Sequence, residues 1–177
     1  MEFVSAISQA LAVLTIAGQI IVIGGITLFM AGRKDMLGFF GKHALAFSFV
    51  VVLVATSGSL FYSEVAGYEP CKLCWFQRIF MYPQALLLGM ALWKRDKGIA
   101  DYSIALSLAG ALIAGYHYLL QLGVAPLLPC AAVGYSVSCA QRFVMQFGYI
   151  TIPLMAFTAF SMVLLFMISR KLTRQEH

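Results

Sequence analysis

Charge is scarce along this chain of 177 residues: Asp, Glu, Lys and Arg make up 11% of it, whereas 62% is hydrophobic. A soluble domain carries about 25% charged residues, so too few charges remain to cover a surface in water. The net charge of +5 is not gathered into a basic patch interleaved with aromatic residues. The composition therefore excludes a cytosolic enzyme, a disordered tail and a nucleic-acid-binding module, and it indicates an integral membrane protein.

Most motifs that carry chemistry are also missing. The sequence has no Gly-rich phosphate loop, no paired acidic residues inside an apolar run and no His/Asp/Glu metal cluster. It has no internal repeat or low-complexity linker either. Any activity must therefore depend on a few residues set in apolar surroundings.

Long uncharged stretches divide the chain into membrane spans. A spanning helix needs about 20 apolar residues, and helices satisfy every backbone polar group within lipid. We predict helices at 6–31, 44–63, 72–93, 102–122 and 147–169. The predicted fold is an all-α integral membrane protein in which an extra N-terminal transmembrane helix and loop (1–43) precede a four-helix transmembrane bundle (44–177).

The basic residues predict the orientation of these spans. Nine of the twelve Lys and Arg residues lie in the 33–42 loop, the 94–97 loop or the C-terminal tail. Because cytoplasmic loops are enriched in Lys and Arg, these three segments are predicted to be cytoplasmic and the N-terminus to be outside. Residues 1 and 2 give no basic n-region, and the first apolar run is too long for a signal sequence, so we expect helix one to be retained.

The four cysteines then all lie outside, where disulfides persist. Cys71 and Cys74 form a Cys-x-x-Cys unit at a predicted helix N-terminus, where the helix dipole favours a thiolate. Cys130 and Cys139 lie between helices four and five. A redox pair is the favoured interpretation, against a structural disulfide, a zinc site built from all four cysteines and two inert thiols.

Two further polar residues stand out in the spans. The uncharged run 79–93 has 15 residues, only about 22 Å of helix at about 1.5 Å per residue. Its helix must begin earlier, which draws Arg78 into the membrane one turn below Cys74, and an ionisable residue there is a functional candidate. His117, near the outer end of helix four, is on its own more typical of an interfacial aromatic belt.

These residues together resemble the DsbB family, and most closely its shorter BdbC-type members. The resemblance rests on residues 70–78 (Pro-Cys-Lys-Leu-Cys-Trp-Phe-Gln-Arg), on Met-Tyr-Pro at 81–83, on Tyr-His-Tyr at 116–118 and on the outer cysteine segment 129–139. It covers roughly residues 44–169. The combination of Cys-x-x-Cys-x-x-x-Arg with a second outer pair is specific, whereas any one element alone is not.

The resemblance implies a membrane disulfide oxidoreductase in the bacterial cytoplasmic membrane. Such a protein reoxidises an extracytoplasmic, DsbA-like thioredoxin-fold thiol oxidase and passes electrons to ubiquinone or menaquinone. By this analogy Cys130 forms the mixed disulfide with the partner, and Cys139 completes the outer pair and links transiently to Cys71. Cys74 is the thiolate beside the quinone, and Arg78 and His117, with Gln77 as a weaker candidate, lie at the quinone site.

Two departures from the family pattern remain, together with two alternatives. The first span lies outside the usual four helices, and the loop between the outer cysteines has only eight residues, 131–138. A vitamin-K-epoxide-reductase-like enzyme uses a similar relay, but there the wider cysteine pair precedes the Cys-x-x-Cys. A non-enzymatic multispan scaffold with structural disulfides is the alternative from another class, and it gives Arg78 no role.

Overall fold

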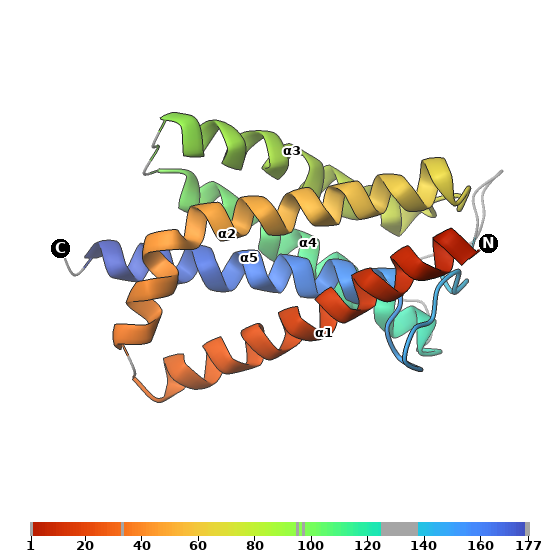
Figure 1. Cartoon of the computed structure of the whole chain (residues 1–177), viewed down its shortest axis with the longest axis horizontal. Coiled ribbons are helices and arrows are strands. Elements are labelled where there is room, and N and C mark those ends of the chain that lie inside the picture. Colours follow the sequence, from red (N-terminus) through yellow and green to blue (C-terminus); the bar gives the residue numbers. More distant parts are fainter. Residues whose placement is uncertain (1, 33, 95, 97, 125–137, 176–177) are drawn as a thin grey trace.

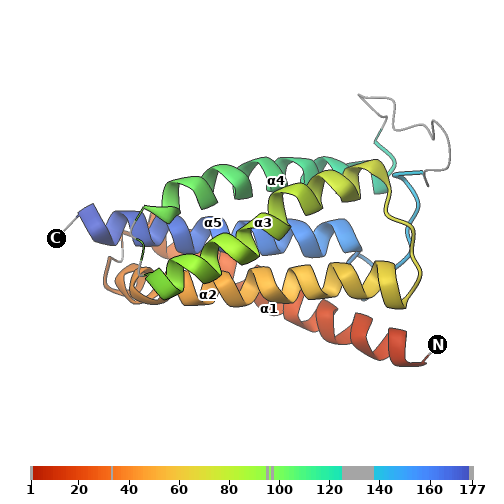
Figure 2. The same ribbon diagram turned by 90° about the horizontal axis from the view of Figure 1, so that it is seen from above.

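A computed structural model describes residues 2–32, 34–94, 96, 98–124 and 138–175. Five α-helices form within these ranges: α1 (Glu2–Met30), α2 (Lys34–Leu60), α3 (Lys72–Lys94), α4 (Ile99–Gln121) and α5 (Ile152–Gln175). A π-helical segment, η1 (Phe61–Val65), continues α2. The helices run side by side, with the two termini at opposite ends of the bundle (Figures 1 and 2). This all-helical bundle confirms the predicted fold class.

The length and composition of the helices confirm a multi-pass membrane protein. Four segments are long and apolar enough to cross a membrane: Glu2–Met30, Phe40–Val65, Ile99–Gln121 and Ile152–Arg174. Helix α3, the predicted third span, is not among them although it has 23 residues. Its polar residues, among them Gln77, Arg78 and Gln84, lower its hydropathy, and Gln77 and Gln84 are buried inside the bundle.

Several predicted boundaries were wrong. Helix α2 begins at Lys34 rather than at 44, so most of the stretch predicted as a cytoplasmic 33–42 loop is helical. Helix α5 begins at Ile152 rather than at 147. The reason is a tight turn in which Phe147 and Gly148 both adopt positive φ angles, 52° and 79°, closed by an isolated bridge between Gln146 and Ile150.

The core lies where α5 packs against α2 and α4. Phe160 of α5 is fully buried, and its ring lies so close to Gly110 of α4 that a Cβ atom at that position would overlap it. Small residues let helix backbones approach closely in membrane bundles. The Gly110–Phe160 contact therefore sets the separation of α4 and α5.

Buried polar side chains join α3 to α4. The Gln84 side-chain oxygen accepts hydrogen bonds from the hydroxyls of Ser103, at 2.7 Å, and Ser107, at 3.1 Å. The Gln84 amide donates to the Phe80 carbonyl at 2.9 Å. Such bonds strengthen helix association where no water competes, and they hold α3, the most polar helix, in register with α4.

Helix α1 lies along α5 and beside the C-terminal half of α2. Its buried residues are all small: Ser8, Ala12, Thr15, Gly18 and Gly25. Large apolar residues such as Ile20 and Ile23 are 65% and 63% exposed on its other face. This arrangement is typical of a helix that packs through small residues and presents its bulky side chains to lipid.

Candidate functional site

The Cys-x-x-Cys unit lies at the N-terminus of α3. Cys71 directly precedes the helix, and its carbonyl accepts a hydrogen bond from the Trp75 amide at 3.1 Å. The Cys71 and Cys74 sulfur atoms are 3.3 Å apart and share a hydrogen bond, and both cysteines are free thiols. Cys71 is only 3% exposed. The two-residue spacing thus brings both sulfurs together at the positive end of the helix dipole.

The Cys71 thiol is strongly acidic in this setting. The pKa of Cys71 is lowered to about 4, mainly by the hydrogen bond with Cys74 and also by the hydrogen bond with His117, against the opposing effect of burial. A thiolate is the nucleophilic form of cysteine. At neutral pH Cys71 is therefore ready for thiol–disulfide exchange.

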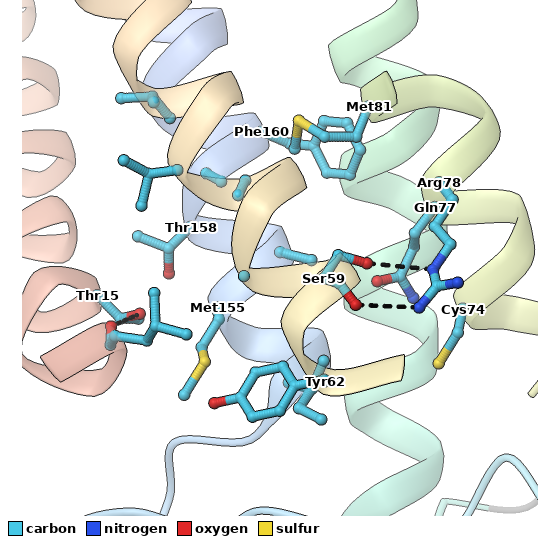
Figure 3. A pocket seen from close by; sticks show the side chains of 18 of the residues that line it. Thr15, Ser59, Tyr62, Cys74, Gln77, Arg78, Met81, Met155, Thr158 and Phe160 are labelled. Carbon is cyan, nitrogen blue, oxygen red and sulfur yellow. Dashed lines mark hydrogen bonds between the residues drawn. The ribbon is translucent and has the colours of Figure 1, made fainter. Parts of the chain in front are cut away.

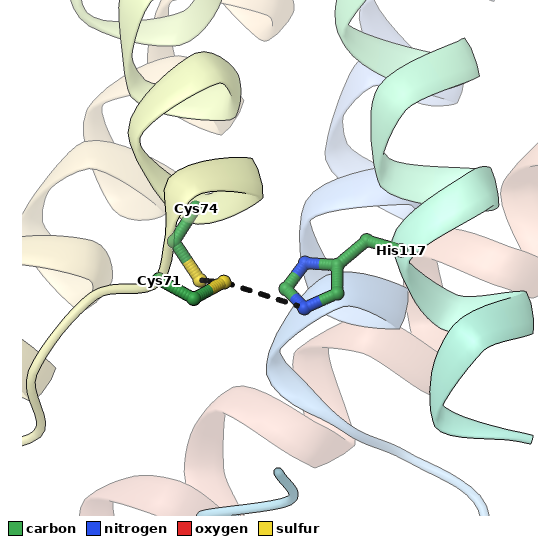
Figure 4. A group of neighbouring side chains, drawn as sticks. All are labelled: Cys71, Cys74 and His117. Carbon is green, nitrogen blue, oxygen red and sulfur yellow. Dashed lines mark hydrogen bonds between the residues drawn. The ribbon is translucent and has the colours of Figure 1, made fainter. Parts of the chain in front are cut away.

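His117 of α4 connects the two cysteine segments (Figure 4). Its Nε2 atom lies 3.6 Å from the Cys71 sulfur and 3.0 Å from the carbonyl oxygen of Cys139. The Gln77 amide nitrogen lies 2.9 Å from Nδ1. An amide N–H can only donate, so Nδ1 is the acceptor and the ring proton is on Nε2. His117 is 2% exposed, which is not the place of a residue in an interfacial belt.

Cys139 closes the site from the segment ahead of α5. It is disulfide-bonded and 2% exposed. The segment is tied to the end of α4 by the Arg142 guanidinium, which donates to the Gln121 carbonyl, and by the Gln121 amide, which donates to the Gln141 carbonyl at 3.0 Å. These contacts hold the Cys139 carbonyl against His117. Cys130, the predicted partner of Cys139, lies outside the described residues.

Metal binding by all four cysteines does not fit this arrangement, because a disulfide-bonded Cys139 offers no thiolate. A different set of ligand types does converge: the ligand atoms of Cys71, Cys74 and His117 lie within 4.8 Å of one another. The sequence search for a metal cluster missed this set, because His117 is far from the cysteines in sequence.

Arg78 lies one turn along α3 from Cys74 and is held there by hydrogen bonds to Ser59 of α2 (Figure 3). Its Nε donates to the Ser59 hydroxyl and one terminal nitrogen donates to the Ser59 carbonyl, both at 3.1 Å. The guanidinium also lies 5.3 Å from the Trp75 ring centroid and 5.9 Å from that of Tyr82, within the range of cation–π attraction. Tyr82 donates to the Ser59 hydroxyl at 3.0 Å. Arg78 therefore has a fixed position.

An apolar cavity of about 270 Å³ begins at Cys74 and Arg78 and extends between α1, α2 and α5. This volume is close to the lower end of the range for small-molecule sites, about 300–1,000 Å³. Most of its lining is hydrophobic, including Val51, Met81 and Met155, and its charged and thiol groups, Arg78 and Cys74, lie together at one end. The cavity thus has the form of a site for an apolar molecule with one polar end.

Cys74 borders two different spaces. On one side it lines the apolar cavity with Arg78. On the other it lines a void of about 20 Å³ that Cys71, His117 and Gln121 share. The thiol pair therefore lies between the Cys139 segment and the cavity.

Most of the residues predicted as a site converge here. Cys71, Cys74, His117 and the Cys139 carbonyl form one cluster, and Arg78 lies beyond Cys74 at the cavity. Sequence reasoning missed Ser59, which has no motif around it and is recognisable only by its contact with Arg78. It also underestimated Gln77, whose i+3 spacing from Cys74 puts both on one helix face.

The family model and the similar proteins all point to the same family. The family model for "Disulfide bond formation protein DsbB" matches residues 41–169. The chain is 41% identical to "Disulfide bond formation protein C" of Bacillus subtilis over 122 residues, 68% of this chain and 86% of that protein. It is 43% identical to a "Probable disulfide formation protein C" of Halalkalibacterium halodurans over 130 residues, 73% of this chain and 92% of that protein. No solved structure matches the chain significantly.

Proposed function

The chain belongs to the DsbB family of disulfide bond formation proteins, and on this premise we propose that it transfers electrons from an extracytoplasmic thioredoxin-fold thiol oxidase to a membrane quinone. Family membership makes it a membrane disulfide oxidoreductase. The proposal adds the two substrates and the residues that serve each of them.

The observation that carries the proposal is the position of Cys74. Its sulfur is 3.3 Å from Cys71, which faces His117 and the Cys139 segment, and it also lines the apolar cavity beside Arg78. A cysteine pair in that position is suited to receive electrons from a thiol partner on one side and to release them to an apolar acceptor on the other. A structural disulfide has no need of such a cavity.

The thiol side of the reaction proceeds by exchange. A thiolate of the reduced partner attacks Cys130, which forms a mixed disulfide and releases Cys139 as a thiolate. Cys139 then attacks Cys71 of the oxidised Cys71–Cys74 pair and releases the Cys74 thiolate toward the cavity. The second partner thiol displaces Cys130, and Cys130 attacks Cys139 to release Cys71. The partner is oxidised to its disulfide, and Cys71 and Cys74 are left as the reduced pair.

His117 supports this exchange from its fixed position. Its Nε2–H donates to the Cys139 carbonyl at 3.0 Å and lies 3.6 Å from the Cys71 sulfur. It therefore holds the attacking and attacked segments together and stabilises negative charge on Cys71. Gln77 fixes this tautomer by donating to Nδ1. In this proposal His117 acts on the thiol exchange more directly than on the quinone.

The cavity fits a quinone head group in size and polarity. One end presents the Cys74 sulfur and the Arg78 guanidinium, and the rest is mostly hydrophobic. A quinone bound here would supply a two-electron acceptor as Cys71 and Cys74 return to the disulfide, and its reduction to the quinol would take up two protons, not all of which the thiol pair carries. Arg78 stabilises the Cys74 thiolate and can donate a hydrogen bond to a carbonyl oxygen. Apolar walls exclude water from the place where the sulfur meets the acceptor.

The proposed location is the bacterial cytoplasmic membrane, with the cysteines and the N-terminus outside. The distribution of basic residues supports this orientation. In it, residues 44–177 form the DsbB-like domain, and residues 1–43 add a helix and its connection.

Quinone reduction by the purified protein tests the proposal. We expect turnover with a reduced thioredoxin-fold protein and a soluble quinone, and its loss in Cys74→Ala and Arg78→Gln. Arg170→Gln, at the other end of the bundle, is the matched control and should keep turnover. Full turnover in Cys74→Ala would overturn the assignment. Two disulfides that resist reduction and alkylation in the folded protein would instead indicate a scaffold.

A further inference from the structure

Helix α1 forms part of the cavity wall although the family match begins only at residue 41. Its residues Leu11, Leu14 and Thr15 line the cavity. Figure 3 shows Thr15 on the far side of the cavity from Cys74 and Arg78. A helix outside the family match therefore contributes to the space that the Cys74–Arg78 site opens into.

The exposed fractions of the lining residues locate the mouth of the cavity. Leu14 of α1 is 56% exposed, and Val50 and Val54 of α2 are 57% and 40% exposed, although all three also line the cavity. Thr15, by contrast, is 7% exposed. Side chains that belong both to the lining and to the outer surface mark an opening, and this one lies between α1 and α2. Because both helices cross the membrane by length and composition, the opening faces lipid.

Close packing on either side of this mouth fixes its position. At Gly58 of α2 a Cβ atom would lie 3.2 Å from the side chain of Leu11. At Gly18 of α1 it would lie 3.0 Å from Thr158 and 2.7 Å from Met162, both on α5. Neither glycine position has room for a side chain, so α1 packs directly against α2 and α5 at the depth of the cavity.

We propose that α1 and α2 form the lipid-side entrance of the quinone cavity and that Leu11, Leu14 and Thr15 contact the hydrocarbon tail of the bound quinone. This inference rests on the proposed function. The head group lies at Cys74 and Arg78, and the tail follows the apolar lining to the opening beside Leu14. Tail contacts of this kind contribute to binding in proportion to the apolar surface they bury, so α1 determines how strongly long-tailed quinones bind.

Photolabelling tests the position of the tail without measuring activity. The probe is a naphthoquinone with a decyl tail that ends in a diazirine, added to the full-length protein in detergent. We expect the label on α1 within residues 11–15, and competition by unlabelled decyl-naphthoquinone. Label confined to α3, to α4 or to residues of α1 that do not line the cavity would overturn the inference.

A pair of variants tests the same point kinetically. Leu14→Trp places bulk in the mouth, whereas Val13→Trp places it on a neighbouring residue that is 55% exposed and does not line the cavity. Both positions face lipid, so neither change disturbs the core. We expect Leu14→Trp to raise KM for the decyl quinone about tenfold, as for the loss of about two buried methylene groups, and Val13→Trp to leave it unchanged.

Naphthoquinone without a tail separates this inference from the proposed function. The wild-type protein and Val13→Trp should reduce it equally well, and the KM of Leu14→Trp for it should rise less than its KM for the decyl quinone. If the wild-type protein reduces neither quinone, the proposed function fails. If it reduces both, and the two tryptophan variants have the same KM for the tailed compound, the role of α1 alone is refuted.

Discussion

Ser59→Ala should weaken quinone reduction without disturbing the fold. The Ser59 hydroxyl accepts hydrogen bonds from the Arg78 Nε at 3.1 Å and from the Tyr82 hydroxyl at 3.0 Å. The substitution removes that acceptor but keeps the Ser59 carbonyl, which holds the other end of the guanidinium at 3.1 Å. Arg78 then keeps one anchor of two and can turn away from the cavity.

The size of the effect follows from the bond that is lost. A hydrogen bond to a charged group is worth about 1.5–3 kcal/mol. The remaining carbonyl bond and the Trp75 and Tyr82 rings still restrain the guanidinium, so the low end of that range applies. A loss of about 1.5 kcal/mol corresponds to a roughly tenfold increase in KM for the quinone.

The assay is steady-state quinone reduction with the reduced partner in excess, so that only the quinone step is varied. Ser161→Ala is the matched control, because its hydroxyl bonds within α5, to the Phe157 carbonyl at 2.8 Å, and to no other part of the described chain. We expect Ser161→Ala to match the wild-type protein. A Ser59→Ala protein with unchanged KM, alongside an Arg78→Gln protein that loses activity, would show that the α2 contact does not position the arginine.

Two further predictions concern the core and the thiol pair. Gly110→Ala should lower the free energy of unfolding by about 1–3 kcal/mol, because the added methyl group overlaps the Phe160 ring. Gly24→Ala is the control, because a methyl group there meets nothing within 4 Å, and it should not lower the free energy of unfolding. Equal thermal stability of the two variants would contradict the packing argument. In the reduced protein, the ultraviolet absorbance of the Cys71 thiolate should persist as pH falls and disappear around pH 4, because its pKa is lowered to about 4. Cys74→Ala removes the main cause of that lowering and should move the midpoint upward, whereas an unchanged midpoint would show that the Cys74 hydrogen bond is not the cause.

The sequence predicts the bundle well, because each apolar run has one stable outcome in lipid. It is less informative at helix ends. The charged residues between 33 and 42 look like a loop, yet they continue α2, since Lys and Asp are compatible with a helix that leaves the membrane. The uncharged stretch after Phe143 looks like a helix, yet the positive φ angles at Phe147 and Gly148 delay α5.

In the candidate site, the sequence predicts contacts within one helix but not contacts between helices. Cys71, Cys74 and Arg78 share one helix, so their spacing alone predicts their proximity. The contacts of His117 and Ser59 join different helices, and no local pattern encodes which side chain a neighbouring helix will present. Family resemblance pointed to His117 but not to its bond with the Cys139 carbonyl, because that bond depends on how the segment ahead of α5 is folded.

The position of Cys74 bears on how the proposed reaction links a reactant in water to a reactant in lipid. In the proposed reaction a water-soluble protein and a lipid-soluble acceptor never meet, and the boundary between their phases runs through one pair of sulfur atoms 3.3 Å apart. No carrier has to cross that boundary. Opening and closing of the Cys71–Cys74 disulfide is the step that passes electrons across this boundary, so the distance bridged there is set by the two-residue spacing of the cysteines.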